Sequence, residues 1–130
     1  MSAMAESKNY AIAVTAISEY VADQSDASLN RYVFAYTVTI HNTGNVAAQL
    51  VSRHWIITDA DGETQEVRGL GVVGHQPVLS PGERFEYTSG CHLSTAVGTM
   101  KGSYQMAAVD GVHFEVAISE FILSMPRSLH

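Results

Sequence analysis

Hydrophobic and polar residues alternate with a period of two along most of the chain, which predicts β-strands rather than helices. The clearest run spans residues 31–41, where five apolar residues share one face: Tyr32, Phe34, Tyr36, Val38 and Ile40. Similar runs are predicted at residues 10–17, 46–58, 63–68, 84–88, 99–109 and 112–123. No segment keeps the helical period for as many as about ten residues.

Turn residues separate these runs at short intervals. Asn42-Thr43-Gly44-Asn45 predicts a hairpin between the runs at 31–41 and 46–58, and Asp59–Gly62 and Asp110-Gly111 predict two more turns. Seven to eight short antiparallel strands with such spacing predict an all-β, immunoglobulin/fibronectin type III-like β-sandwich. Residues 1–8 are expected to form a disordered tail, residues 9–127 a single domain, and residues 22–29 a polar loop.

The tryptophan of the chain indicates which face of its strand is buried. Alternation places Trp55 on the same face as Val51 and Ile57, with His54 on the opposite face. A tryptophan on a long strand favours a place in the core of the sandwich. The alternative is an exposed aromatic contact residue flanked by Arg53.

A glycine pattern follows the polar run at 63–68. Gly69, Gly71 and Gly74 match the G-x-G-x-x-G fingerprint of dinucleotide sites, which requires a helix directly after the glycines. Pro77 and Ser80-Pro81-Gly82 leave no room for that helix. The glycines therefore serve either as bends in a connection, or as a backbone nest that binds an anion with help from Arg68 and His75.

The same segment resembles the ApaG family of small bacterial proteins. The resemblance rests on GVVGHQPVLSPGERFEYTSG at residues 71–90, GTMKGSYQM at 98–106, and HNTGN with RHWIITDADGE within 41–63. It covers roughly residues 9–127, and Ala96 departs from it where a proline is expected. It implies a fibronectin type III-like sandwich without enzymatic activity, an association with Co²⁺ and Mg²⁺ homeostasis, and protein binding, since related eukaryotic domains occur in protein-interaction subunits.

Composition and charge argue against some classes of partner and favour one cellular location. The formal charge of −6, without any run of Lys or Arg, argues against binding to nucleic acid. No segment has the length and apolarity of a membrane helix or a signal peptide, so we expect no membrane insertion. The lone Cys91 excludes an internal disulfide, and together these features favour a cytoplasmic location.

Residues suited to catalysis or metal binding are present without the arrangement that either chemistry needs. The six histidines are scattered, and none forms an i, i+2 pair on one strand face. Ser89-Gly90-Cys91-His92 lacks a supporting third group, and an unactivated thiol is mostly protonated near neutral pH. We therefore predict no catalytic residue, no cofactor and no metal site.

Two functions remain open at this point. The first is a non-catalytic protein-interaction module, linked by family resemblance to Co²⁺/Mg²⁺ homeostasis, with another protein as its partner. The second is a domain that binds a small anion, either pyrophosphate or a nucleotide phosphate, through the glycine loop. The binding residues predicted for this region are Arg68, Gly69, Gly71, Gly74, His75 and Gln76.

Overall fold

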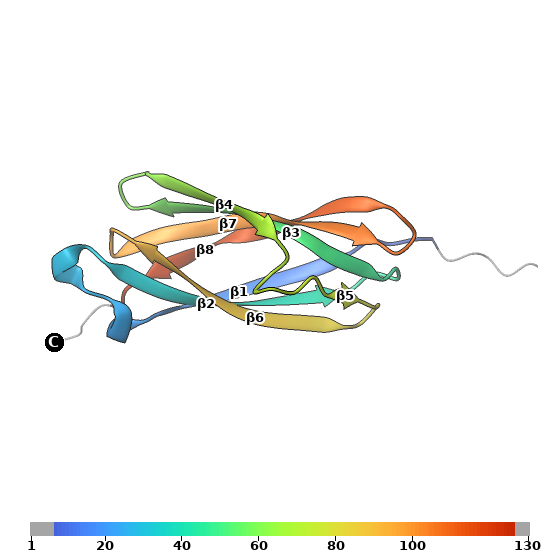
Figure 1. Cartoon of the computed structure of the whole chain (residues 1–130), viewed down its shortest axis with the longest axis horizontal. Helices are drawn as coiled ribbons and strands as arrows, with labels where there is room; N and C mark the ends of the chain where they lie inside the picture. The colour runs from blue at the N-terminus through green and yellow to red at the C-terminus, as the bar shows by residue number, and fades with distance from the viewer. Residues whose placement is uncertain (1–6, 127–130) are drawn as a thin grey trace, which may run out of the picture.

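Two antiparallel sheets face each other and form a β-sandwich in the computed structural model, which describes residues 7–126 (Figure 1). The first sheet has the order β1-β2-β6 and consists of β1 (Ile12–Tyr20), β2 (Tyr32–Asn42) and β6 (Arg84–Leu93). The second has the order β4-β3-β7-β8 and consists of β3 (Ala48–Asp59), β4 (Thr64–Leu70), β7 (Val97–Ala108) and β8 (His113–Ser124). The two-residue strand β5 (Val78–Leu79) also pairs with β3, and the 3₁₀ helices η1 (Ala22–Gln24) and η2 (Ala27–Leu29) occupy the predicted polar loop. The predicted all-β, immunoglobulin/fibronectin type III-like architecture is confirmed.

The two lateral sides of the sandwich differ. On one side β1 packs beside β8, and Ser18 Oγ donates a hydrogen bond to the carbonyl oxygen of Ile122 at 2.7 Å. On the other side the edge strands β6 and β4 face each other across the gap between the sheets. A cleft opens between them, lined by residues of β2, β3, β4, β6 and β7.

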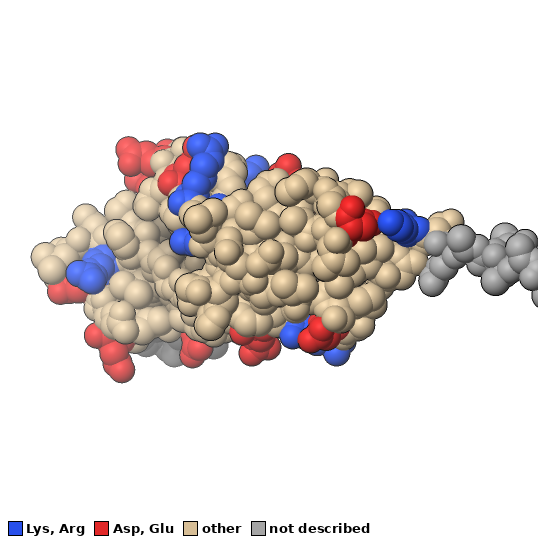
Figure 2. All heavy atoms as spheres, turned by 45° about the vertical axis from the view of Figure 1, so that its right-hand side comes forward, with Lys and Arg blue, Asp and Glu red and all other residues tan. Residues whose placement is uncertain are grey.

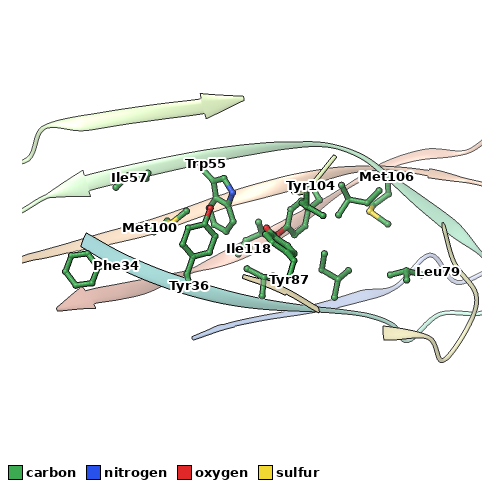
Figure 3. Close-up of a cluster of buried hydrophobic side chains, with 14 of the residues drawn as sticks. Phe34, Tyr36, Trp55, Ile57, Leu79, Tyr87, Met100, Tyr104, Met106 and Ile118 are labelled. Atoms are coloured by element: carbon green, nitrogen blue, oxygen red, sulfur yellow. The ribbon is translucent and has the colours of Figure 1, made fainter. Parts of the chain in front are cut away.

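The core lies between the sheets and has the composition that alternation predicts. On β2 the side chains of Phe34, Tyr36, Val38 and Ile40 are buried, as expected for the run at 31–41. Trp55 projects from the facing sheet toward Tyr36 and is 1% exposed, which confirms its predicted place in the core (Figure 3). The remaining buried side chains come from both layers and include Leu50, Tyr87, Tyr104, Met106 and Leu123.

Two tyrosines meet inside this core. The hydroxyl groups of Tyr87 on β6 and Tyr104 on β7 hydrogen-bond to each other, so neither buried hydroxyl is left without a partner. Burial raises the pKa of both phenols, that of Tyr87 to about 12. Both hydroxyls therefore remain protonated over the physiological pH range, and their pairing ties the two sheets together.

The prediction that Val51 and Trp55 lie on the same face of β3 is wrong. A β-bulge shifts the register with β7 between Leu50 and Ser52, because Leu50 pairs with Met106 and Ser52 with Gln105. The extra residue reverses the alternation at this point. Leu50 is therefore fully buried, while Val51 is only half-buried.

The connection between β2 and β3 is not the predicted hairpin, since the two strands belong to different sheets. Asn42 explains how the chain crosses between them. Its Nδ2 donates to the carbonyl oxygens of Val46 and Leu79, both at 2.9 Å, and its Oδ1 accepts from the N–H of Gly44 at 2.9 Å. The side chain is 1% exposed, so Asn42 is a buried residue that links neighbouring segments by hydrogen bonds, and not a surface turn residue.

The segment before β1 is attached to the sandwich. Residues 1–6 of the predicted tail lie outside the described range, as do residues 127–130. Asn45 Nδ2 donates to the carbonyl oxygen of Ser7 at 2.7 Å, and Lys8 Nζ lies 2.9 Å from Asp110 Oδ2. Tyr10 donates to the same Asp110 oxygen at 2.6 Å. The hydrogen bonds from Lys8 and Tyr10 lower the pKa of Asp110 to about 2.

The contribution of these buried Asn42 hydrogen bonds to stability can be tested by Asn42→Ala. The substitution removes donors from two carbonyl oxygens in a site that water does not reach, so we expect the free energy of unfolding to fall by about 3 kcal/mol. Urea denaturation followed by Trp55 fluorescence measures this change. Thr43→Ala, at the exposed neighbouring position, is the control. An equal loss in both variants would contradict the assignment to Asn42.

Asp110→Asn tests the attachment of the first strand. Because the pKa of Asp110 is lowered in the folded state, its contribution to stability is complete above about pH 4 and is lost as the pH falls toward 2. The variant should therefore be less stable than the parent at pH 7, and the difference should shrink as the pH falls from 4 through 2, as measured by urea denaturation over this range. Asp61→Asn, in the β3–β4 turn, is the control, and a difference that is as large at pH 2 as at pH 7 would contradict this explanation.

Candidate functional site

The glycine segment after β4 forms a tight β-hairpin. The N–H of Val72 donates to the carbonyl oxygen of His75 and the N–H of His75 donates back, both at 2.8 Å. The two residues between them, Val73 and Gly74, have φ angles of 43° and 82°. Positive φ at both central positions characterises a type I′ turn. The residues that follow lead into β5, so the dinucleotide fingerprint lacks the helix on which its chemistry depends.

Arg53 of β3 holds the beginning of this loop. Its Nη1 donates to the carbonyl oxygens of Leu70 at 3.0 Å and Gly71 at 2.8 Å. Gly69 lies directly opposite Arg53 in the β3–β4 register, and a Cβ atom on Gly69 would lie 2.8 Å from Nη1. Gly69 is therefore needed because the guanidinium packs against its backbone.

Further contacts fix the rest of the loop. Gln76 Nε2 donates to the carbonyl oxygen of Val51 at 2.8 Å, and Gln49 Nε2 donates to that of Gln76 at 3.0 Å. The ring of His75 packs against Phe85, with 5.9 Å between ring centroids, and Val72 is fully buried. The segment is a structured element attached to both sheets, and the predicted site residues Gly69–Gln76 lie together in it.

The backbone donors of the loop are directed inward. The N–H of Gly71 donates to the carbonyl oxygen of Val51 at 2.8 Å, and those of Val72 and His75 close the hairpin. These three groups therefore do not converge on an anion in this conformation. Arg68 extends away on β4, with its side chain 70% exposed and Nη2 3.8 Å from Glu66 Oε2. The N–H groups of Gly71, Val72 and His75 are therefore not available to form an anion nest with Arg68.

The outer surface of the loop displays apolar side chains. Leu70 is 75% exposed, Val73 50% and Val78 52%. A groove of about 410 Å³ lies beside Leu70 and is lined by Ser52, Arg53, His54, Arg68, Gly69 and Gln105. Figure 2 shows one face of the molecule, on which charged side chains lie toward the margins and a broad area between them carries none.

Val73 combines exposure with an unfavourable backbone conformation. A β-branched residue rarely adopts positive φ, because its Cβ substituents crowd the neighbouring carbonyl group. Asparagine, aspartate or glycine normally occupies this position of a type I′ turn. Half of the Val73 side chain faces solvent, so packing of the core does not account for its presence.

Cys91 and the five histidines of the described range form no group that could hold a metal ion. Burial raises the pKa of the Cys91 thiol to about 11, so it stays protonated near neutral pH. Within residues 7–126, no group of three or more His, Cys, Asp or Glu side chains has an arrangement that could hold a metal ion. In the same range no helix is long and apolar enough to cross a membrane.

The role of Arg53 as the anchor of the loop was not predicted from the sequence. The signal was present, because Arg53 lies two residues before Trp55 and therefore on the inward face of β3. Arg53 is half-buried, and every other Lys or Arg in the described part of the chain is exposed. A charged residue on a core-facing position requires partners, and here those partners are loop carbonyl groups.

Comparison with known proteins identifies the family. The ApaG domain profile matches residues 22–108. The chain is 65% identical to Protein ApaG of Nitrosomonas europaea and 61% identical to that of Dechloromonas aromatica, covering 98% of this chain and 100% of each relative. A crystal structure described as an ApaA protein from Bordetella pertussis superimposes with a TM-score of 0.90 at 59% identity, covering 93% of this chain and 98% of that one. The chain therefore belongs to the ApaG family.

Proposed function

We propose that this protein is a non-catalytic protein-interaction module and that the loop Gly69–Gln76, together with Val78, is its contact surface. The observation that carries the proposal is Val73, an exposed β-branched residue held at a φ angle of 43°. Strain of this kind occurs preferentially at functional positions, where the displayed side chain has a use. An apolar side chain fixed at the tip of a loop is suited to insert into a pocket of a partner.

The rigidity of the loop supports this proposal. Arg53 and Gln76 attach the loop to β3, and His75 packs against Phe85 of β6, so little conformational freedom is lost when a partner binds. The protonated Cys91 thiol supports the absence of nucleophilic catalysis. The involvement in Co²⁺/Mg²⁺ homeostasis that the family resemblance implies would then pass through the partner protein, and the location would be cytoplasmic.

The substitution Val73→Asn separates folding from binding. Asparagine tolerates positive φ, so we expect the variant to be more stable by about 1 kcal/mol, with the unfolding midpoint raised by about 4 °C. The same variant should lose partners that the parent protein captures from a bacterial lysate, as measured by affinity capture and mass spectrometry. Val109→Asn, at an exposed valine of the β7–β8 turn, is the control for lost apolar surface. Retention of the same partners by Val73→Asn would contradict the assigned contact surface.

The substitution Gly69→Ala tests whether Arg53 makes the loop rigid. The new methyl group would displace the guanidinium and release the carbonyl groups of Leu70 and Gly71. We expect the amide hydrogens of Gly71, Val72 and His75 to exchange about tenfold faster, since a lost charge-assisted hydrogen bond destabilises the closed loop. Gly90→Ala on β6 is the control, because its methyl group would make only an ordinary contact at 3.4 Å. Unchanged exchange in Gly69→Ala would show that the loop is rigid without Arg53.

A further inference from the structure

The cleft between the edge strands β4 and β6 is a second candidate site, distinct from the outer surface of the loop. Its volume is about 290 Å³, and its polar lining includes Tyr36, Arg53, Trp55, Ser89 and Cys91. Tyr36 and Trp55 point toward each other from opposite sheets, with 5.4 Å between ring centroids (Figure 3). No aspartate or glutamate lines the cleft, although the protein carries a net charge of −6.

Trp55 provides a buried hydrogen-bond donor in this cleft. Its Nε1 is buried and has no hydrogen-bond partner among the described residues. The other edge of the indole faces β7, since a Cβ atom on Gly102 would lie 3.1 Å from Cε3. The Nε1 edge therefore faces the opposite neighbour of β3, which is β4, on the side where the cleft opens. A buried indole N–H normally has an acceptor, so this donor indicates where an acceptor would be bound.

Arg53 provides a positive charge without a carboxylate partner. Both of its hydrogen bonds to described residues come from Nη1, and Arg53 forms no ion pair within residues 7–126. Arg53 is half-buried and lines the cleft. Removal of this charge from water is costly unless an anion compensates it. Its Nε and Nη2 groups remain as donors for such an anion.

Neutral hydroxyl groups complete the lining. Tyr36 and Ser89 are directly opposite each other in the β2–β6 register. Burial raises the pKa of Tyr36, and a hydrogen bond with Ser89 only partly offsets this shift. The phenol therefore stays protonated at neutral pH and can donate a hydrogen bond. Together with Arg53 and Trp55, these side chains place donors from both sheets along the same cleft.

We propose that the cleft binds a carboxylate group, with Arg53 as its counter-ion and Trp55 Nε1, Tyr36 and Ser89 as hydrogen-bond donors. The planar guanidinium matches the planar carboxylate, and one cation compensates one negative charge. A phosphate dianion would leave one charge uncompensated in a half-buried site. This inference is independent of the proposed contact surface, because a carboxylate could bind in the cleft whether or not the loop binds a protein.

The carboxylate belongs either to a small free acid or to the C terminus of a peptide. The cleft lies between two sheet edges, where the terminal residues of an extended chain could enter beside β4 or β6. A small free acid would need only the donors inside the cleft. The two sources share the same recognition chemistry, and their affinities distinguish them.

The indole signal of Trp55 gives a direct measurement. The chain contains one tryptophan, so its ¹H–¹⁵N correlation spectrum holds one indole Nε1–H signal. We expect this signal to move saturably when acetate is added to the full chain at constant ionic strength, and not to move with acetamide. An acetylated tripeptide ending in alanine and its C-terminal amide are then compared. Binding of the free-acid peptide at least about tenfold tighter than acetate indicates a peptide terminus, and equal affinity indicates a small acid.

Variants assign the effect to the named side chains. Arg53→Gln removes the charge and keeps an N–H donor near the loop, so we expect acetate affinity to fall by at least about tenfold. Ser89→Ala should lower it about fivefold and lies outside the loop anchor, so it provides the test if Arg53→Gln fails to fold. Arg68→Gln, which removes an exposed cation from β4, should bind acetate like the parent. Absence of saturable movement in the parent protein, an equal shift with acetamide, unchanged affinity in a folded Arg53→Gln, or unchanged affinity in Ser89→Ala would overturn the proposal.

Discussion

The burial of Trp55 between the sheets is the constraint from which the arrangement of the site follows. Its ring makes edge-on contacts with Tyr36, Tyr104 and Phe121, with centroid separations of 5.4 Å, 6.2 Å and 6.0 Å. These contacts join both layers through one side chain and fix which face of β3 points inward. Because side chains alternate along a strand, Arg53 must then point inward as well. A charged residue is thereby placed at the margin of the core, where the loop carbonyl groups stabilise it.

The glycine loop depends on that placement. Each glycine of the pattern has a different structural reason. Gly69 leaves space for the guanidinium of Arg53, Gly71 adopts a φ of 63° where a Cβ atom would lie 2.3 Å from the carbonyl oxygen of His75, and Gly74 adopts a φ of 82° in the turn. Their spacing reproduces a nucleotide-binding fingerprint, yet the resulting element is a β-hairpin packed on β3. The match to the fingerprint therefore does not indicate a dinucleotide site, because no helix follows the glycines.

Sequence analysis predicted the sandwich, the buried face of β2 and the core position of Trp55, because strict alternation and turn residues are local signals. The predictions were wrong where a local sequence signal is compatible with two different structures. The residues Asn42–Asn45 suit a hairpin and a crossing between sheets equally well, and the choice depends on Leu79, far away in the sequence. The bulge at Val51 likewise follows from pairing with β7, which alternation within β3 cannot reveal. The predicted binding residues follow one another along the end of β4 and the loop after it, but their anchor on β3, Arg53, was not predicted.

The asymmetry of the sandwich explains why polar groups collect on one of its sides. Where β1 packs beside β8, the gap between the sheets is closed, and Ser18 bonds across it to a backbone carbonyl. Between β4 and β6 the gap stays open, so side chains there can be polar while their backbone remains in regular strands. The same edge carries the rigid loop on its outer surface and the half-buried Arg53 beneath it. One arginine thus supports two surfaces: it fixes the hairpin that displays Val73, and it supplies the charge of the cleft. A change at Arg53 will therefore affect both surfaces, whereas Val73 and Ser89 each belong to only one, and this separation allows the two proposed activities to be examined independently.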